Sequence, residues 1–363
     1  MLDRIQLREI DWVLIGLVLA NSAVGVILIF SAAHVLAGSF ALKQILWLLV
    51  CFLLLFAMLA FDYKLLMAMA PYIYGLIILI LIGLIVFGRA VGGAKSWVPV
   101  AFMGGQPSEL AKVAVLLLLA RVFAEFKHPY VTRFRALLSG AVVTLPVVLI
   151  ALQPDLGTAM CFLPLWLASL ALAGLKRRTL VILIVVGLVV GFLGWNFFLK
   201  DYQKERLKTV VNPAGDPRGS GYHVLQSKIA IGSGGFLGKG FMKGSQAQLK
   251  FLPARHTDFI FSVLGEEFGF VGVMFSLGLY FLLLARIFRS VTKSRDRAGL
   301  YIIFLAGCMI AFPFLVNVLM IIGLFPITGV PIPLLSYGGS SLLSTYLAVG
   351  LVVNVRMRRF ANV

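Results

Sequence analysis

Three acidic side chains stand where long apolar segments begin, a costly place for an ionisable group. They are Glu109 in Gln-Pro-Ser-Glu, Asp155 in Gln-Pro-Asp and Asp258 in Arg-His-Thr-Asp. Ionisable groups at membrane depth are expensive and usually functional, and a positioned carboxylate can take a proton from a hydroxyl group. An acid in the first turn also caps a helix, worth about 0.3–1 kcal/mol. For any one of the three acids, capping is the commoner role.

Basic residues gather near these acids in the chain. The stretch 198–257 holds ten Lys or Arg residues and three acids. Helix N-termini bind phosphate groups, and a further apolar segment starts after Pro-Ile-Pro-Leu-Leu-Ser-Tyr-Gly-Gly-Ser-Ser (331–341). The combination favours a phosphorylated ligand anchored in the membrane, with carboxylates beside it for proton chemistry. The alternative is simple attraction of the basic stretch to anionic lipid headgroups.

Two further acidic features have structural interpretations. Lys112 follows Glu109 by three residues, which places both on one side of a helix and predicts a structural ion pair. Glu266 and Glu267 lie about two turns into the next apolar segment, where they face either a polar cavity or Lys112. The sequence does not decide between these two.

The elements that must position these groups are membrane-spanning helices. Of the 363 residues, 61% are apolar and 13% are charged, and the mean hydropathy is +1.03. Long uncharged runs predict an all-α integral membrane protein. We expect ten spans, at residues 12–31, 43–61, 69–87, 108–123, 136–152, 156–173, 179–197, 258–284, 299–324 and 340–355.

The distribution of positive charge predicts the orientation. Lys and Arg concentrate at both termini and in every second loop, while the loops 153–155 and 325–339 have none. This pattern places both termini in the cytoplasm, and it accounts for the net charge of +18 without a nucleic acid partner. Residues 198–257 then form one large extracytoplasmic loop between spans seven and eight, within a single transmembrane domain of residues 1–363. Long loops cross the membrane largely regardless of charge.

The long loop has two recognisable pieces. Residues 224–231 are a helical candidate, and Gly-Ser-Gly-Gly-Phe-Leu-Gly-Lys-Gly (232–240) is rich in glycine. The second piece matches neither a Walker loop nor a dinucleotide fingerprint, because the required Gly and Ser or Thr positions are filled by other residues. We expect its glycines to allow tight turns.

Six motifs together resemble the SEDS family over essentially the whole chain. In chain order they are QPSELAK, QPDLGTA, DYQKERLK, GYHVLQSKIAIGSGGFLGKG, LPARHTDFIF with GEEFGFVG, and PIPLLSYGGSS. Two positions depart from the family pattern: Ala254 stands where an acid is expected, and Ser96 stands where an Arg is common. If that Arg binds phosphate in relatives, Lys95 would take its place here.

The resemblance implies a peptidoglycan glycosyltransferase that polymerises lipid II into glycan strands during cell elongation. It implies a multi-pass protein of the bacterial cytoplasmic membrane with an extracytoplasmic active site. A class B penicillin-binding protein and the elongation machinery are the implied partners. The catalytic Asp of the family maps onto Asp258.

Chemistry then suggests roles for other residues. Asp258 would take the proton of the acceptor 4-hydroxyl, which attacks the donor C1 with inversion and releases undecaprenyl pyrophosphate. Cations offset the charge on that leaving group, and the candidates in order are Arg255, Lys228 and Lys239. Gln226, Lys95, Asp155 and Ser336 are also predicted to bind substrate. A divalent cation, Mg²⁺ or Mn²⁺, at Asp155 or Asp258 is a candidate cofactor that the sequence does not decide.

Two other functions fit ten membrane spans. One is a lipid II flippase, which needs polar residues at mid-depth, whereas the ionisable residues here cluster at the outer ends of the spans. The other is a non-catalytic scaffold that recruits the penicillin-binding protein.

Overall fold

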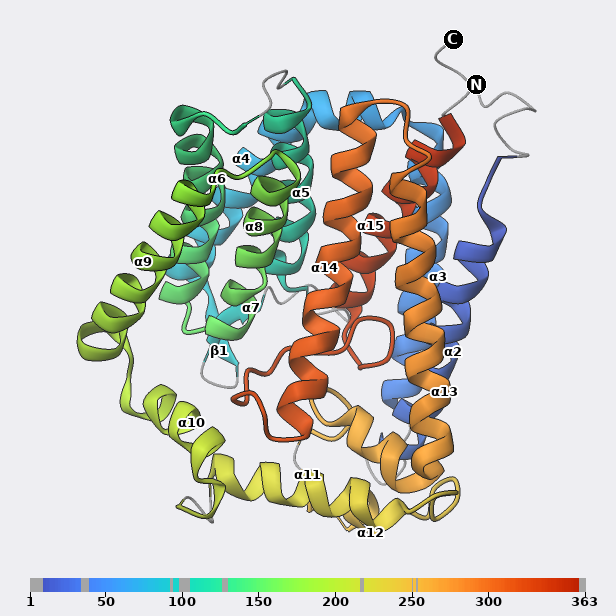
Figure 1. Cartoon of the computed structure of the whole chain (residues 1–363). Coiled ribbons are helices and arrows are strands. Elements are labelled where there is room, and N and C mark those ends of the chain that lie inside the picture. Colours follow the sequence, from blue (N-terminus) through green and yellow to red (C-terminus); the bar gives the residue numbers. More distant parts are fainter. Residues whose placement is uncertain are drawn as a thin grey trace.

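The structure is a computed structural model. It describes residues 9–33, 39–91, 94–97, 105–125, 130–215, 219–249, 251–252 and 254–358. Within these ranges the chain is a bundle of long helices that run between two ends of the molecule (Figure 1).

The helices follow the predicted apolar runs one for one. In chain order these helices are α2 (Trp12–Ala33), α3 (Ser39–Ala60), α4 (Tyr63–Phe87), α5 (Pro107–Ala124), α6 (Arg133–Leu152), α7 (Leu156–Met160) with α8 (Phe162–Leu172), α9 (Arg177–Leu193), α13 (Ile260–Val291), α14 (Arg297–Ile321) and α15 (Gly339–Met357). In the described part of the chain, eight of them are long and apolar enough to cross a membrane; α5 and the pair α7–α8 are not among the eight. The helical membrane fold is therefore confirmed, while the count of ten spans stays a prediction.

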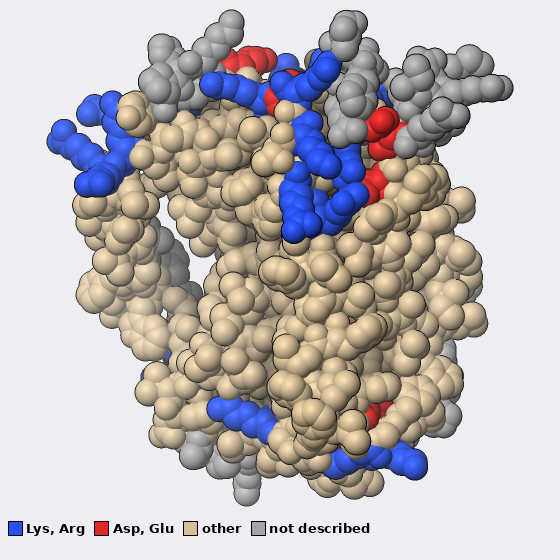
Figure 2. Space-filling view, turned by 45° about the vertical axis from the view of Figure 1, so that its right-hand side comes forward, with Lys and Arg blue, Asp and Glu red and all other residues tan. Residues whose placement is uncertain are grey.

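The two ends of the molecule differ. The start of α2 and the end of α15 lie at one end, and the segment after α9 crosses the other end (Figure 1). Charged side chains gather at both ends, and a broad uncharged band lies between them on the face shown in Figure 2. This banding is what a bilayer requires, because charged side chains are costly in its hydrocarbon core.

The interior of the bundle is formed by α5, α14 and α15. Each carries buried residues all along its length, and α15 packs against α3, α5 and α14. By contrast, α9 stands at the edge of the bundle, and its apolar window has no buried residue (Figure 1). The functional groups are therefore positioned by a packed centre, and α9 is the least constrained long helix.

The long loop is more ordered than the sequence suggested. A π-helical turn (Gly194–Phe198) follows α9, and then come α10 (Asp201–Val211), a 3₁₀ turn (Pro213–Gly215), α11 (Ser220–Gly234) and α12 (Ser245–Gln248). The predicted helix at 224–231 lies inside α11, whereas α10 was not predicted. Before α5, the described residues include a small antiparallel hairpin of β1 (Arg89–Val91) and β2 (Ala94–Trp97), also not predicted.

The glycine-rich piece packs against a kink in α13. Gly269 has φ 62° inside that helix, and a Cβ there would lie 2.3 Å from the backbone N of Gly238. Gly238 itself has φ 80°, and the backbone N–H groups of Lys239 and Gly240 donate to the carbonyls of Glu266 and Glu267. The glycines therefore serve a tight turn, as predicted, and also a close contact between two backbones.

Candidate functional site

Asp258 lies in a turn just before α13, and two buried side chains fix the backbone around it. The Asn317 amide on α14 donates to the carbonyl of Asp258 at 2.9 Å and to that of Val330 at 2.8 Å. The Ser336 hydroxyl donates to the Thr257 carbonyl at 2.7 Å and accepts from the Ile332 N–H at 2.9 Å. The segment between α14 and α15 thus holds the turn that presents Asp258.

The carboxyl group of Asp258 is poised to exchange a proton. Burial raises its pKa to about 6, although a hydrogen bond with Thr257 and the positive charge of Arg206 act in the opposite direction. Its Oδ2 would lie 3.6 Å from a Cβ on Gly329, so it faces the loop 326–330. Among the described residues no cation lies within ion-pairing distance of it. A carboxylate with this pKa and little internal hydrogen bonding suits a general base near neutral pH.

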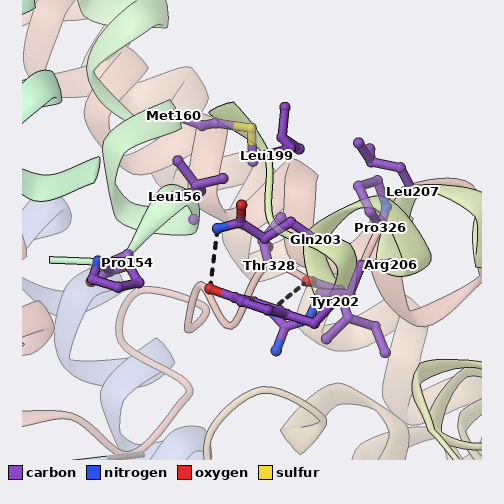
Figure 3. A pocket seen from close by; sticks show the side chains of 13 residues that line it. Pro154, Leu156, Met160, Leu199, Tyr202, Gln203, Arg206, Leu207, Pro326 and Thr328 are labelled. Carbon is purple, nitrogen blue, oxygen red and sulfur yellow. Dashed lines mark hydrogen bonds between the residues drawn. The ribbon is translucent and has the colours of Figure 1, made fainter. Parts of the chain in front are cut away.

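A cavity of about 190 Å³ lies against the other side of the loop 326–330. Its lining comes from the start of α7, from α10 and from Pro326, Ile327 and Thr328 (Figure 3). Arg206 donates to the Ile327 carbonyl at 3.2 Å, and its guanidinium lies 5.7 Å from the centre of the Tyr202 ring. Gln203 donates to the Tyr202 hydroxyl at 3.1 Å, and with Arg206 and Leu207 these make four residues of α10 that line the cavity (Figure 3).

Asp155 lines the same cavity and caps α7. It accepts hydrogen bonds from the Thr158 N–H at 3.1 Å, the Thr158 hydroxyl at 2.9 Å and the Gln106 amide at 2.8 Å. Burial raises the pKa of its carboxyl group, and these hydrogen bonds with Thr158 oppose that rise. The backbone N–H of Gln106 in turn donates to the Ser340 hydroxyl at the start of α15, at 2.8 Å. Asp155 therefore joins the starts of three helices, and both of its predicted roles, cap and ligand, remain compatible with its position.

The structure has Glu109 and Lys112 in an ion pair of 2.7 Å, with both side chains about 5% exposed. The second oxygen of Glu109 accepts from the Ser344 hydroxyl on α15 at 2.8 Å. A buried pair with this extra hydrogen bond links α5 to α15, which fits the predicted structural role.

Three of the predicted binding residues are used inside the protein instead. Arg255 is buried and donates to the Ala247 carbonyl, so it does not point toward the cavity. Ser336 is 4% exposed, and its hydroxyl is committed to the two backbone groups described above. Lys239 is paired with Glu266 at 2.7 Å. The geometry gives no support to substrate binding by these three, because Arg255 and Ser336 are buried and Lys239 is already paired with Glu266, and their roles stay predictions.

The remaining predicted binding residues have different positions. Lys228 on α11 is exposed and lies against Gly323, where a Cβ would come within 2.7 Å of its Nζ. Gln226, also on α11, is half-buried. The Lys95 side chain lies outside the described residues, and its role in substrate binding stays a prediction.

The two adjacent acids in α13 are held by the long loop. Glu266 accepts from the Lys239 ammonium at 2.7 Å, from the Ser245 hydroxyl at 3.1 Å and from the Gln246 N–H at 2.9 Å. Glu267 accepts from the Ser31 hydroxyl on α2 at 2.5 Å. The suggestion that either acid faces Lys112 was wrong, since Lys112 pairs with Glu109.

Sequence reasoning missed Arg206, although its motif was noted. Arg206 follows Tyr202 by four residues and Gln203 by three, which places these side chains on one face of a helix. That spacing was the available signal. Residues 201–211 were expected only as part of the large extracytoplasmic loop 198–257, with no helix.

The candidate metal ligands are sparse. Among the described residues no group of three or more His, Cys, Asp or Glu side chains could hold a metal ion. Mg²⁺ is often bound by one or two carboxylates together with substrate phosphates. Asp155 and Asp258, which border the same loop, would fit only that kind of shared site.

Comparisons with known proteins agree with one another. The sequence profile of the FtsW, RodA and SpoVE proteins, described as "Cell cycle protein", matches residues 10–360. Peptidoglycan glycosyltransferase MrdB of Escherichia coli (strain K12) is 40% identical over 295 residues, covering 80% of this chain and 78% of that protein. Peptidoglycan glycosyltransferase RodA of Treponema pallidum (strain Nichols) is 34% identical over 429 residues, covering 97% and 98%.

Solved structures extend the likeness to the fold. A chain from a study titled "Structural coordination of polymerization and crosslinking by a peptidoglycan synthase complex" matches with TM-score 0.83 and 33% identity, covering 97% of this chain and 99% of that one. The rod shape determining protein RodA of Thermus thermophilus matches with TM-score 0.72 and 31% identity, covering 97% and 98%.

Proposed function

The chain belongs to the FtsW, RodA and SpoVE family of cell cycle proteins, and on this premise we propose that it is a peptidoglycan glycosyltransferase that polymerises lipid II. The resemblance to the SEDS family is thereby confirmed. The protein is a multi-pass membrane protein. The bacterial cytoplasmic membrane, and an active site on its outer side, are parts of the proposal that the charge distribution supports.

The observation that carries the proposal is the state of Asp258. Burial raises the pKa of its partly exposed carboxyl group to about 6, and hydrogen bonds from Asn317 and Ser336 to backbone carbonyls hold the turn just before α13 that carries it. A group with that pKa is mostly ionised at neutral pH, yet basic enough to accept a proton from a hydroxyl.

The proposed step is a single displacement. The acceptor 4-hydroxyl gives its proton to Asp258 while its oxygen forms the new bond to C1 of the donor sugar. The bond from C1 to the pyrophosphate oxygen breaks, and undecaprenyl pyrophosphate leaves with the bonding electrons. Attack opposite the leaving group inverts the anomeric centre.

Arg206 is the cation best placed to assist. It lines the cavity beside Asp155, and its positive charge also lowers the pKa of Asp258, so it is close enough to influence both acids. A guanidinium can bind a phosphate through two parallel hydrogen bonds. We therefore assign pyrophosphate contact to Arg206 in place of Arg255, with Lys228 as a second candidate. A divalent cation shared with Asp155 or Asp258 would add charge at the same place.

A crosslinking partner completes the proposal. One structural neighbour belongs to a peptidoglycan synthase complex that coordinates polymerization and crosslinking. This supports a class B penicillin-binding protein as the partner of this chain, within the elongation machinery.

The test is polymerisation of lipid II by the purified protein, with and without the penicillin-binding protein. We expect glycan strands from the wild-type chain and none from Asp258→Asn, while both proteins retain lipid II. Translocation of lipid II across liposomes without strand formation would contradict the proposal and favour a flippase. Retained binding of the penicillin-binding protein with no polymerisation by any form would favour a scaffold.

A further inference from the structure

A second cavity lies at the opposite end of the molecule from Asp258, between the starts of α6 and α9. Its volume is about 580 Å³, against about 190 Å³ for the cavity beside Asp155. Tyr130 and Arg133 line it from one side, and Lys176, Arg178 and Ile182 line it from the other. The glycosyltransferase chemistry described above makes no use of it.

The two sides of this cavity are joined by specific contacts. The Val131 N–H donates to the Gly174 carbonyl at 3.1 Å, which ties the loop before α6 to the loop before α9. The Lys176 ammonium lies 5.1 Å from the centre of the Tyr130 ring, a cation–π contact between the same two loops. The cavity is therefore built by two connected loops and is not a chance gap beside α9.

The lining is strongly basic. Arg133, Lys176 and Arg178 are exposed, and no Asp or Glu is among the described residues that line the cavity. None of the three is in an ion pair with a carboxylate in the described part of the chain. Figure 2 shows a group of Lys and Arg side chains at this end, on the side where α9 stands. Three cations around one hollow without an acid make a binding site for an anion, and two of them are guanidinium groups suited to phosphate.

The two helices that begin at the cavity carry exposed apolar side chains, of which Ile182 lines the cavity itself. On α6, Phe134 is 73% exposed and Leu137 is 74% exposed. On α9, Val181 is 58% exposed and Ile182 is 53% exposed. Both helices are candidate membrane spans, so these side chains meet acyl chains in the bilayer. A ligand that satisfies the whole site has an anionic head and hydrocarbon tails.

We propose that this cavity binds the phosphate headgroup of an anionic diacyl phospholipid, whose acyl chains lie along the exposed faces of α6 and α9. The lipid comes from the leaflet at the end where the chain's termini lie, which is cytoplasmic in the proposed orientation. Bound there, it supplies α9 with the packing that the protein does not provide. The proposal depends on membrane insertion and is independent of the role of Asp258.

The test is native mass spectrometry of the purified protein titrated with phosphatidylglycerol, with phosphatidylcholine of the same acyl chains as the neutral lipid. The test variant is Arg133→Gln, Lys176→Gln and Arg178→Gln together. The control variant is Arg289→Gln, Lys293→Gln and Arg297→Gln, three exposed cations of the α13–α14 connection at the same end.

We expect the wild-type protein to bind phosphatidylglycerol more tightly than phosphatidylcholine. Each cation is worth on the order of fivefold, so the test variant should bind the first phosphatidylglycerol about 100-fold more weakly. The control variant should stay within about threefold of wild type, because its cations do not line the cavity. If the triple test variant does not fold, Arg178→Gln alone should show the loss of about fivefold.

Two results would overturn the proposal. Equal losses in the test and control variants would mean a general attraction between positive charge and anionic lipid. Competition by glycerol phosphate at the same concentration as phosphatidylglycerol would mean a site for a soluble anion, with no part for the acyl chains.

Discussion

Asp258 and Glu266 are only eight residues apart in the chain, yet their surroundings are opposite. Glu266 is fully buried and accepts hydrogen bonds from an ammonium, a hydroxyl and a backbone N–H. Asp258 is partly exposed beside a loop, with Thr257 as its hydrogen-bonding neighbour and Arg206 as a more distant charge. A carboxylate saturated with donors has no capacity left for a substrate, so the less satisfied of the two is the one we propose as the reactive group.

The comparison is tested most strongly by Asp258→Asn. The amide keeps the shape but cannot accept the proton, so we expect the polymerisation rate to fall by about 10²–10⁴-fold with little change in thermal stability. Gel analysis of strands made from lipid II measures the rate. Asp201→Asn, which changes an exposed acid on α10, is the matched control and should keep full activity. A wild-type rate for Asp258→Asn would remove the proposed base.

Glu266→Gln should lower stability and leave the polymerisation rate nearly unchanged, the reverse of Asp258→Asn. It removes the charge that holds Lys239, the Ser245 hydroxyl and two backbone N–H groups, and hydrogen bonds to charged groups contribute about 1.5–3 kcal/mol. We expect a loss of about 2–3 kcal/mol in unfolding free energy, seen as a lower melting temperature, with kcat within about threefold where the protein is folded. Adding Lys239→Gln to Glu266→Gln should lower the unfolding free energy little further, because the carboxylate partner of Lys239 is already gone. An unchanged melting temperature would contradict the structural role of Glu266.

Arg206→Gln tests the electrostatic setting of Asp258. The base works only when ionised, so the rate of the wild-type protein should fall as the pH drops through about 6. Arg206 lowers that pKa, so its removal should move the acidic limb to higher pH and cost about three- to tenfold at pH 6, more than at pH 8.

The pH dependence of strand synthesis measures this shift. Lys208→Gln, an exposed cation on the same helix, should leave the acidic limb in place. Identical pH profiles for Arg206→Gln and wild type would mean that Arg206 does not influence the base.

Ser336→Ala should give the smallest effect. The hydroxyl bridges the Thr257 carbonyl and the Ile332 N–H, and such a hydrogen bond contributes about 1 kcal/mol. We expect kcat to fall a few-fold, on the scale that about 1 kcal/mol represents, with KM unchanged. Ser341→Ala serves as the control at a neighbouring, less buried position. A rise in KM with kcat unchanged would instead restore the prediction that Ser336 binds substrate.

Much of the helical layout follows from the apolar runs. The predicted spans 12–31 and 69–87 overlap almost fully with α2 and α4, because a run of about twenty apolar residues has few other stable structures in a bilayer. The run at 156–173 was found, but its division into α7 and α8 at Cys161 was not. Such a break depends on local packing, and hydropathy does not register it.

The site was predicted less completely. Asp258 was identified from a motif, and the motif marks which residue matters. The motif does not show which way a neighbouring side chain turns, and Arg255 turns inward to the Ala247 carbonyl. Arg206 was missed because its cavity is assembled by α7, α10 and the loop 326–330, which are far apart in the chain.

The sequence alone determined that this protein is a helical membrane protein of the SEDS type with an acid at position 258, because hydropathy and motifs are local properties of the chain. The tertiary structure alone decided which charges are free to act. Lys239 and Glu266 pair with each other inside the fold, whereas Asp258 and Arg206 border the loop 326–330. Pairing between charges is set by distance in space, and Arg206 and the Ile327 carbonyl that it contacts are 121 residues apart in the chain.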